Sequence, residues 1–194
     1  MSLPQRFELQ VDYLRRHPEC VALGTWAILT DAEGWPIGQH SSLQTHEEID
    51  ERHERGSAGQ IIHPTVMCPR VALTTIGGYR VELRAAQDYD LFLRLAELGR
   101  VANLPHVLLR YRQQRGSVGQ RGREIQINET IRILREARQR RGLPALTEDP
   151  AWLRPDAPSS STEIDRVWAY MALAAGNVGT ARKYALSRMA LPEA

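Results

Sequence analysis

At 194 residues and 42% hydrophobic, the chain is long enough to bury one core but too short for two large domains. Its 25 basic and 23 acidic residues nearly cancel, which argues against the single-sign charge of a dedicated nucleic-acid-binding protein. Two cysteines are too few for a disulfide scaffold, and no apolar run approaches the ~18 residues of a membrane span. We therefore expect a cytoplasmic protein with no membrane span and no nucleic-acid partner.

The first predicted element is a helix. Pro4 stands where the first turn of a helix accepts proline, and apolar residues then recur with helical spacing at Phe7, Val11 and Leu14. This pattern predicts an amphipathic helix, with those three residues on its apolar face, that stops before Pro18.

A hairpin and a charged helix are expected next. Residues 20–30 are apolar and β-branched enough for a strand, and a turn at 31–34 returns the chain through 35–39 at a sheet edge. Thr45 followed by Glu48 is a capping-box pattern. The helix that it begins is so charged that we expect most of it to be solvated.

The middle of the chain alternates between extended and helical patterns. Residues 61–67 predict a short strand interrupted by a proline, and residues 70–75 predict a single helical turn. A better helix is expected over 88–98 and an extended segment over 101–112. The segment 115–123, rich in Gly, Ser and Arg, predicts a flexible loop.

The carboxy-terminal part is predicted to be helical. A long helix over 123–141 is followed by a proline-rich linker, then by two helices with small residues between them. This helical hairpin resembles a single tetratricopeptide-type repeat. We divide the chain into a cloning leader (1–3), a main domain (4–142), a linker (143–158) and the helical hairpin (159–194).

A series of short motifs is the most informative feature of the sequence. PQRF at 4–7 is followed by HPTVM at 63–67, IGGY at 76–79, QDYDLFLRL at 87–95 and LLRYRQQ at 108–114. In this order, the chain from Pro4 to Ser117 resembles the family 2 glycosyltransferases of the GT-A fold.

The resemblance implies an α/β fold: a partial GT-A-like mixed sheet with flanking helices, followed by the helical hairpin. It covers the acceptor side only, because the family's metal-binding DxD motif and uridine-binding strands should precede Pro4. We expect a fragment that is inactive alone and that self-associates through its exposed sheet edge.

The complete parent is expected to be an inverting glycosyltransferase. It would move a sugar from a nucleotide-sugar donor to a hydroxyl acceptor in bacterial polysaccharide or lipid-linked glycan assembly, at the membrane surface. The family's Mg²⁺ or Mn²⁺ would bind to the DxD motif, so no metal site is expected in this chain.

Asp88 occupies the position of the family's general base. That role needs an ionised carboxylate held within hydrogen-bond reach of the acceptor hydroxyl, and the amino terminus of a helix favours the anion. The alternative is that Asp88 only caps the helix. Asp90 is expected to form a surface ion pair with Arg94, one helical turn later.

Neighbouring residues are expected to bind substrate. Gln87 stands where the family has glutamate, and an amide still offers hydrogen bonds without a second charge. Gly77, Gly78 and Tyr79 either let the backbone approach the acceptor or sugar, or form an ordinary left-handed turn.

The end of the family's motif series predicts contacts to the donor diphosphate. Arg112 and Arg115 could hold the diphosphate through paired hydrogen bonds, or they could be solvated loop residues. Gln114 replaces the family's histidine, and an amide is a poorer ligand for a transition metal than imidazole.

Two other interpretations remain open from the sequence. The helical hairpin could make the chain a non-enzymatic protein-interaction module. His46, Asp50 and His53 share one helical face and could bind a metal, although a solvated face is the better interpretation for so charged a helix.

Overall fold

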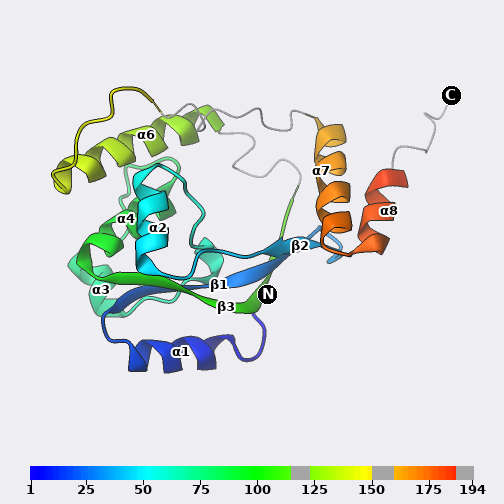
Figure 1. Cartoon of the computed structure of the whole chain (residues 1–194), viewed down its shortest axis with the longest axis horizontal. Coiled ribbons are helices and arrows are strands. Elements are labelled where there is room, and N and C mark those ends of the chain that lie inside the picture. Colours follow the sequence, from blue (N-terminus) through cyan, green and yellow to red (C-terminus); the bar gives the residue numbers. More distant parts are fainter. Residues whose placement is uncertain (115–122, 150–159, 187–194) are drawn as a thin grey trace.

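A computed structural model describes residues 1–114, 123–149 and 160–186 (Figure 1). Its centre is a mixed three-stranded sheet in the order β2-β1-β3. Strand β1 (Cys20–Thr30) runs antiparallel to β2 (Pro36–His40) and parallel to β3 (Arg100–Arg112). The expected α/β architecture with a mixed sheet is therefore confirmed.

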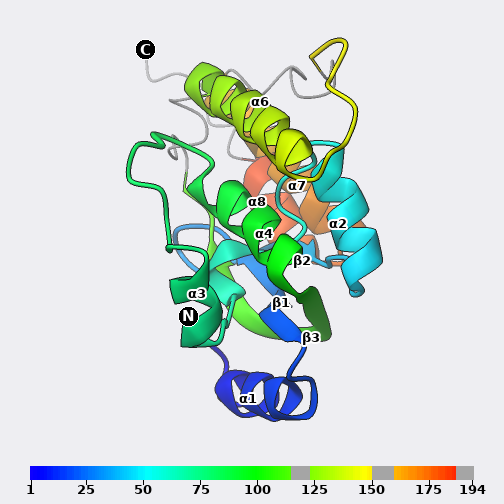
Figure 2. The ribbon, with the colours of Figure 1, turned by 90° about the vertical axis from the view of Figure 1, so that its left-hand side faces the viewer.

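Helices cover both faces of the sheet (Figures 1 and 2). Helix α1 packs under one face, while α2, α4 and α6 lie over the other. The bounds of the helices in this part are α1 Arg6–Arg16, α2 His46–Glu54, η1 His63–Thr65, α3 Arg70–Thr75, α4 Gln87–Leu98 and α6 Arg123–Arg140. A core cluster lies on each side of the sheet.

Helix α1 buries only part of the face that its apolar spacing predicts, with Leu14 packed against the core on this side of the sheet. Phe7 is 59% exposed, and Val11 is also exposed, whereas Gln10 is completely buried. The Gln10 amide donates to the carbonyls of Leu23 at 2.8 Å and Thr65 at 2.9 Å. The helix is therefore oriented by a buried polar side chain that satisfies backbone acceptors which water cannot reach.

The strand predicted over residues 61–67 is wrong. The chain forms the short 3-10 helix η1 (His63–Thr65), and only Met67 makes a β-bridge, to Leu23. Pro64 lies in the first turn of η1, where its missing N–H is not needed. The Thr65 hydroxyl then donates to the Ile62 carbonyl at 2.7 Å, which stabilises the turn.

Helix α2 has the predicted capping box at Thr45 but is not mostly solvated. Ile49 and His53 on one of its faces are fully buried. On the same helix, Asp50 and Glu54 both bind the guanidinium of Arg141, at 2.9 and 2.7 Å. One face of this charged helix can therefore pack against the rest of the molecule, because an arginine just beyond the end of α6 pairs with two of its carboxylates, whereas Glu47, Glu48, Glu51 and Arg52 stay exposed.

The two carboxy-terminal helices form the predicted hairpin. Helix α7 (Ser161–Ala174) and helix α8 (Val178–Leu186) are joined by a turn at Gly176, and a capping box on Ser160 begins α7. Both helices contact β2, so the hairpin lies against the sheet (Figure 1). The predicted loop 115–123 lies almost entirely outside the described residues, as do part of the linker and the end of the hairpin.

The first three residues lie along the outer edge of β3. Ser2 forms an antiparallel bridge with Leu109, and the Leu3 N–H donates to the Leu108 carbonyl at 2.9 Å. Residues 1–3 thus cover part of the sheet edge. Among the described helices, none is long and apolar enough to cross a membrane.

Candidate active site

The site begins with a contact between two motifs that are distant in sequence. His63 in η1 and Tyr79 after α3 are hydrogen-bonded through Nε2 and the phenol oxygen, at 2.7 Å. Both side chains are partly exposed, and the His63 ring also lies edge-on to the buried Phe92 of α4. His63 belongs to the HPTVM motif, but the sequence alone did not predict that it lies at the site.

Gly77 and Gly78 place Tyr79 by ending helix α3. Both glycines have positive φ, of 77° and 69°, which side-chain-bearing residues rarely adopt. Their N–H groups bond to carbonyls of α3, with Gly78 donating to Leu73 at 2.8 Å. The structure thus shows the turn that was one of the two predicted roles, and a substrate contact of these glycines stays a prediction.

Asp88 lies in the first turn of α4, half-buried. The cap position belongs to Ala86, in the left-handed conformation with φ 57°, so Asp88 is not the N-cap. Its Oδ1 accepts a hydrogen bond from the N–H of Tyr89 at 2.9 Å. Within the described residues this is its only side-chain hydrogen bond, which leaves Oδ2 available to a ligand.

Electrostatics connect Asp88 to Tyr79. The pKa of Tyr79 is raised, first by burial and then by the negative charges of Cys68, when ionised, and of Asp88. At neutral pH the phenol therefore keeps its proton and can donate a hydrogen bond. His63 and Tyr79 form a hydrogen-bonded pair, and the charge of Asp88 lies near enough to act on the Tyr79 phenol.

The predicted ion pair between Asp90 and Arg94 is confirmed, but it is buried rather than on the surface. Asp90 is completely buried. Its Oδ2 accepts hydrogen bonds from Arg94 at 2.9 and 2.5 Å, while Oδ1 lies 2.9 Å from the Arg80 guanidinium. Two arginines are needed here because a buried carboxylate without compensating charge is very costly.

The buried pair also holds the glycine turn. Arg94 donates to the carbonyls of Ile76 and Gly78, at 2.7 and 2.8 Å. Arg80 continues the network to Glu136 of α6, at 2.6 Å. Asp90 therefore orients Arg94, and Arg94 fixes the backbone that leads directly into Tyr79.

The remaining predicted residues lie in different places. The Gln87 amide donates to the Leu83 carbonyl at 3.0 Å, which ties it to its own loop. Arg112 is exposed at the end of β3, and Gln114 lines a separate pocket against the helical hairpin. Arg115 lies outside the described residues.

The described residues do not supply a metal site. No group of three or more His, Cys, Asp or Glu side chains lies close enough together among them to hold an ion. Asp88 and Asp90 have D-x-D spacing, yet Asp90 is buried between two arginines. A divalent cation does not fit this donor set.

Two glycosyltransferases are similar in sequence to this chain. It is 31% identical over 136 residues to the amylovoran biosynthesis glycosyltransferase AmsE of Erwinia amylovora, an alignment that covers 70% of this chain and 50% of that protein. It is 27% identical over 142 residues to the putative glycosyltransferase EpsE of Bacillus subtilis (strain 168), covering 72% of this chain and 49% of that protein. No protein-family model matches the sequence.

These similarities support a glycosyltransferase family for this chain. The aligned regions take in most of the chain. The chain spans about half the length of the curated relatives that it matches.

Proposed function

We propose that this chain is the acceptor-side part of an inverting family 2 glycosyltransferase of the GT-A fold. Its parent would transfer a sugar from a nucleotide sugar to a hydroxyl of a growing bacterial polysaccharide. The observation that carries the proposal is the Asp88 carboxylate, held in the first turn of α4 with its charge acting on the Tyr79 phenol, which is hydrogen-bonded to His63.

Asp88 supplies the base of the reaction. Its Oδ2 accepts the proton of the acceptor hydroxyl while the hydroxyl oxygen bonds to the anomeric carbon of the donor sugar. The bond from that carbon to the nucleoside diphosphate breaks in the same step, and the diphosphate leaves with the electron pair. The amino terminus of α4 favours the ionised carboxylate, and its rigidity fixes the position of Oδ2.

Tyr79 and His63 orient the acceptor. The phenol, hydrogen-bonded to His63, can donate to or accept from a sugar hydroxyl next to the one that reacts. Asp90 does not touch substrate in this proposal. It acts as a positioning residue, because Arg94 links it to the turn that carries Tyr79.

The donor half is proposed to lie in a preceding segment of the parent. That segment would carry the DxD carboxylates, and Mg²⁺ or Mn²⁺ bound there would neutralise the diphosphate. AmsE is named for amylovoran biosynthesis. For the parent of this chain we propose only that the product is a polysaccharide, without naming which one.

Two preparations test the proposal: the complete gene product and this chain of 194 residues. With a panel of nucleotide sugars, the complete product should release nucleoside diphosphate and glycosylate a hydroxyl acceptor, and this chain should do neither. Nucleoside diphosphate released by this chain above a buffer control, and abolished by a substitution within it, would contradict the division into two halves. A complete product that transfers no sugar to any acceptor, in extracts that contain lipid-linked glycans, would overturn the proposal.

A further inference from the structure

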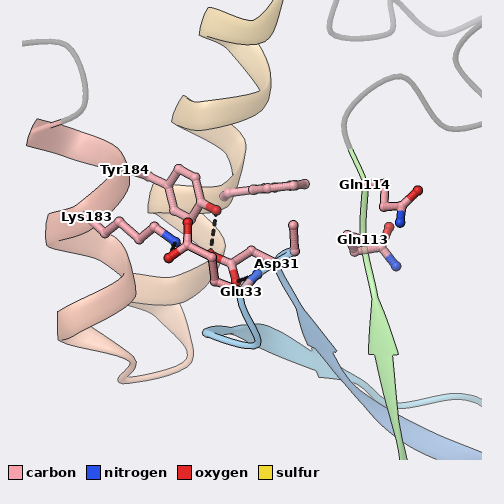
Figure 3. Close-up of a pocket in the computed structure, with 8 residues that line it drawn as sticks. Asp31, Glu33, Gln113, Gln114, Lys183 and Tyr184 are labelled. Atoms are coloured by element: carbon pink, nitrogen blue, oxygen red, sulfur yellow. Dashed lines mark hydrogen bonds and ion pairs between the residues drawn. The ribbon is translucent and has the colours of Figure 1, made fainter. Parts of the chain in front are cut away.

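A pocket of about 470 Å³ lies between the end of the sheet and the helical hairpin (Figure 3). Its walls come from the turn between β1 and β2, the end of β3, and helices α7 and α8. The volume falls in the range of ~300–1,000 Å³ that is typical of small-molecule sites. Gln114, expected from sequence to contact a diphosphate, is one of its lining residues.

One wall of the pocket is held by Asp31. This carboxylate accepts hydrogen bonds from the N–H groups of Glu33 and Trp35 on Oδ1, at 3.0 and 2.8 Å. On Oδ2 it accepts from the Lys183 ammonium and the Tyr184 hydroxyl, at 2.5 and 2.7 Å. Asp31 thus uses both oxygens to join the turn to α8, and this wall is rigid before any ligand enters.

The charge of the lining residues disfavours an anion. Lys183 already pairs with both Asp31 and Glu33, at 2.5 and 3.2 Å. Among the described lining residues, two carboxylates face this single cation, so a negative charge is in excess. A diphosphate would meet repulsion there rather than attraction.

The opposite wall offers neutral hydrogen-bonding groups. Gln113 and Gln114 lie at the end of β3, across the pocket from α8 (Figure 3). No hydrogen bond of either side-chain amide to another described residue is present. Each amide has two donors and an acceptor, which matches the mixed donors and acceptors of vicinal hydroxyl groups.

An aromatic residue completes the lining. Trp168 of α7 lies edge-on to Tyr184, with ring centroids 5.2 Å apart. This contact fixes the indole without relying on any ligand. A fixed aromatic face next to planar amides can pack against the C–H face of a pyranose while the amides bind its hydroxyls.

We propose that this pocket binds a neutral saccharide, a segment of the acceptor glycan beyond the hydroxyl that reacts. The inference rests on the proposed function for its biological context, but the binding itself needs only this chain. The helical hairpin then acts as a wall of an acceptor subsite, and Trp168, Gln113 and Gln114 are the residues that contact the sugar.

Binding can be measured on the 194-residue chain through the indole N–H signal of Trp168 in ¹H–¹⁵N spectra, assigned with Trp168→Phe. The probes are glucose, galactose, N-acetylglucosamine and the β-linked disaccharides of these sugars. Inorganic diphosphate at the same concentrations serves as the anionic comparison. At least one saccharide should shift the signal in a saturable manner, and diphosphate should not.

Variants then assign the contacts. Trp168→Ala should weaken saccharide binding at least about tenfold, as expected for loss of an aromatic anchor. Gln113→Ala and Gln114→Ala should each weaken it about two- to tenfold, the effect of one lost hydrogen bond. Tyr170→Ala is the matched control, because Tyr170 belongs to the same helix, is 76% exposed and does not line the pocket.

Three outcomes would overturn the inference: no saturable shift with any saccharide, a saturable shift with diphosphate alone, or equal weakening by Tyr170→Ala. The glutamine variants keep the test valid if Trp168→Ala fails to fold. Failure of the transferase proposal is seen separately, as absence of transfer by the complete product. Saccharide binding here without transfer would leave the pocket assignment standing.

Discussion

The guanidinium of Arg94 donates two hydrogen bonds to one oxygen of Asp90, and it donates two more to the carbonyls of Ile76 and Gly78. A fully buried carboxylate is in this way coupled to the turn before Tyr79. Because of this coupling, substitution of Asp90 should lower the stability of the fold, whereas loss of an exposed ion pair would have almost no effect on it.

Asp90→Asn should destabilise the fold by about 3 kcal/mol, because it leaves two arginines beside a group without charge. Urea unfolding monitored by circular dichroism measures the loss. Asp12→Asn is the control: Asp12 and Arg16 have the same helical spacing, but both side chains are more than half exposed. That variant should lose less than about 1 kcal/mol. Equal losses of stability in the two variants would show that the buried network contributes no more to stability than the exposed pair does.

Asp88→Asn tests the general base in the complete gene product. The amide keeps the size of the side chain and its acceptor for the Tyr89 N–H, but it cannot take a proton. Transfer should fall by roughly 10² to 10⁴-fold while the thermal midpoint barely changes. Asp12→Asn again provides the control for activity. If Asp88→Asn keeps more than about a tenth of parental turnover, Asp88 is not the base.

Tyr79→Phe removes the hydroxyl that bonds to His63. If this hydroxyl orients the acceptor, kcat/KM for the acceptor should fall about two- to tenfold, with the KM for the donor unchanged. Steady-state kinetics with each substrate varied in turn measure both values. An increase in the donor KM instead would place Tyr79 at the donor side.

The stability of the chain should decline in mild acid because of His53. Burial lowers the pKa of this histidine to about 4, with a smaller opposing effect from Asp50. In the unfolded chain its pKa is about 6.5, so between these values the unfolded state binds more protons, and stability falls as the pH falls. Protonation should cost up to about 3 kcal/mol at pH 4.

Urea midpoints at pH 7, 6, 5 and 4 test this dependence. His53→Leu should remove the contribution of His53 to the dependence of the urea midpoint on pH. The smaller contribution of the partly buried His40 should remain. His106→Gln, at an exposed position, should leave the whole slope unchanged. An unaltered slope in His53→Leu would rule out this histidine as its source.

Self-association of the chain should depend on residues 1–3. They cover backbone groups of β3 at Leu108 and Arg110. Their deletion should expose that edge and raise the dimer fraction seen by sedimentation velocity, because unpaired strand edges seek partners. As a control, the substitution Ser2→Ala keeps the backbone bonds and should behave as the parent. A deletion variant that stays monomeric at high concentration would argue against this edge as the contact.

Local signals in the sequence determined the elements of this protein well. The capping box at Thr45, the glycine turn at 77–78 and the helix beginning near Asp88 all depend on residues a few positions apart. Such contacts form within one element, so periodicity and turn chemistry report them directly. The motif order also indicated the glycosyltransferase resemblance.

Tertiary structure alone decided which faces and which distant residues meet. Gln10 is buried, while Phe7 is exposed, because the Gln10 amide donates to carbonyls of the sheet and of η1. His63 meets Tyr79, and Gln114 joins a pocket with Lys183, only because the chain returns from far along its length. Helical spacing fixes which residues share a face, but the burial of that face depends on the partner groups that the folded chain places opposite it.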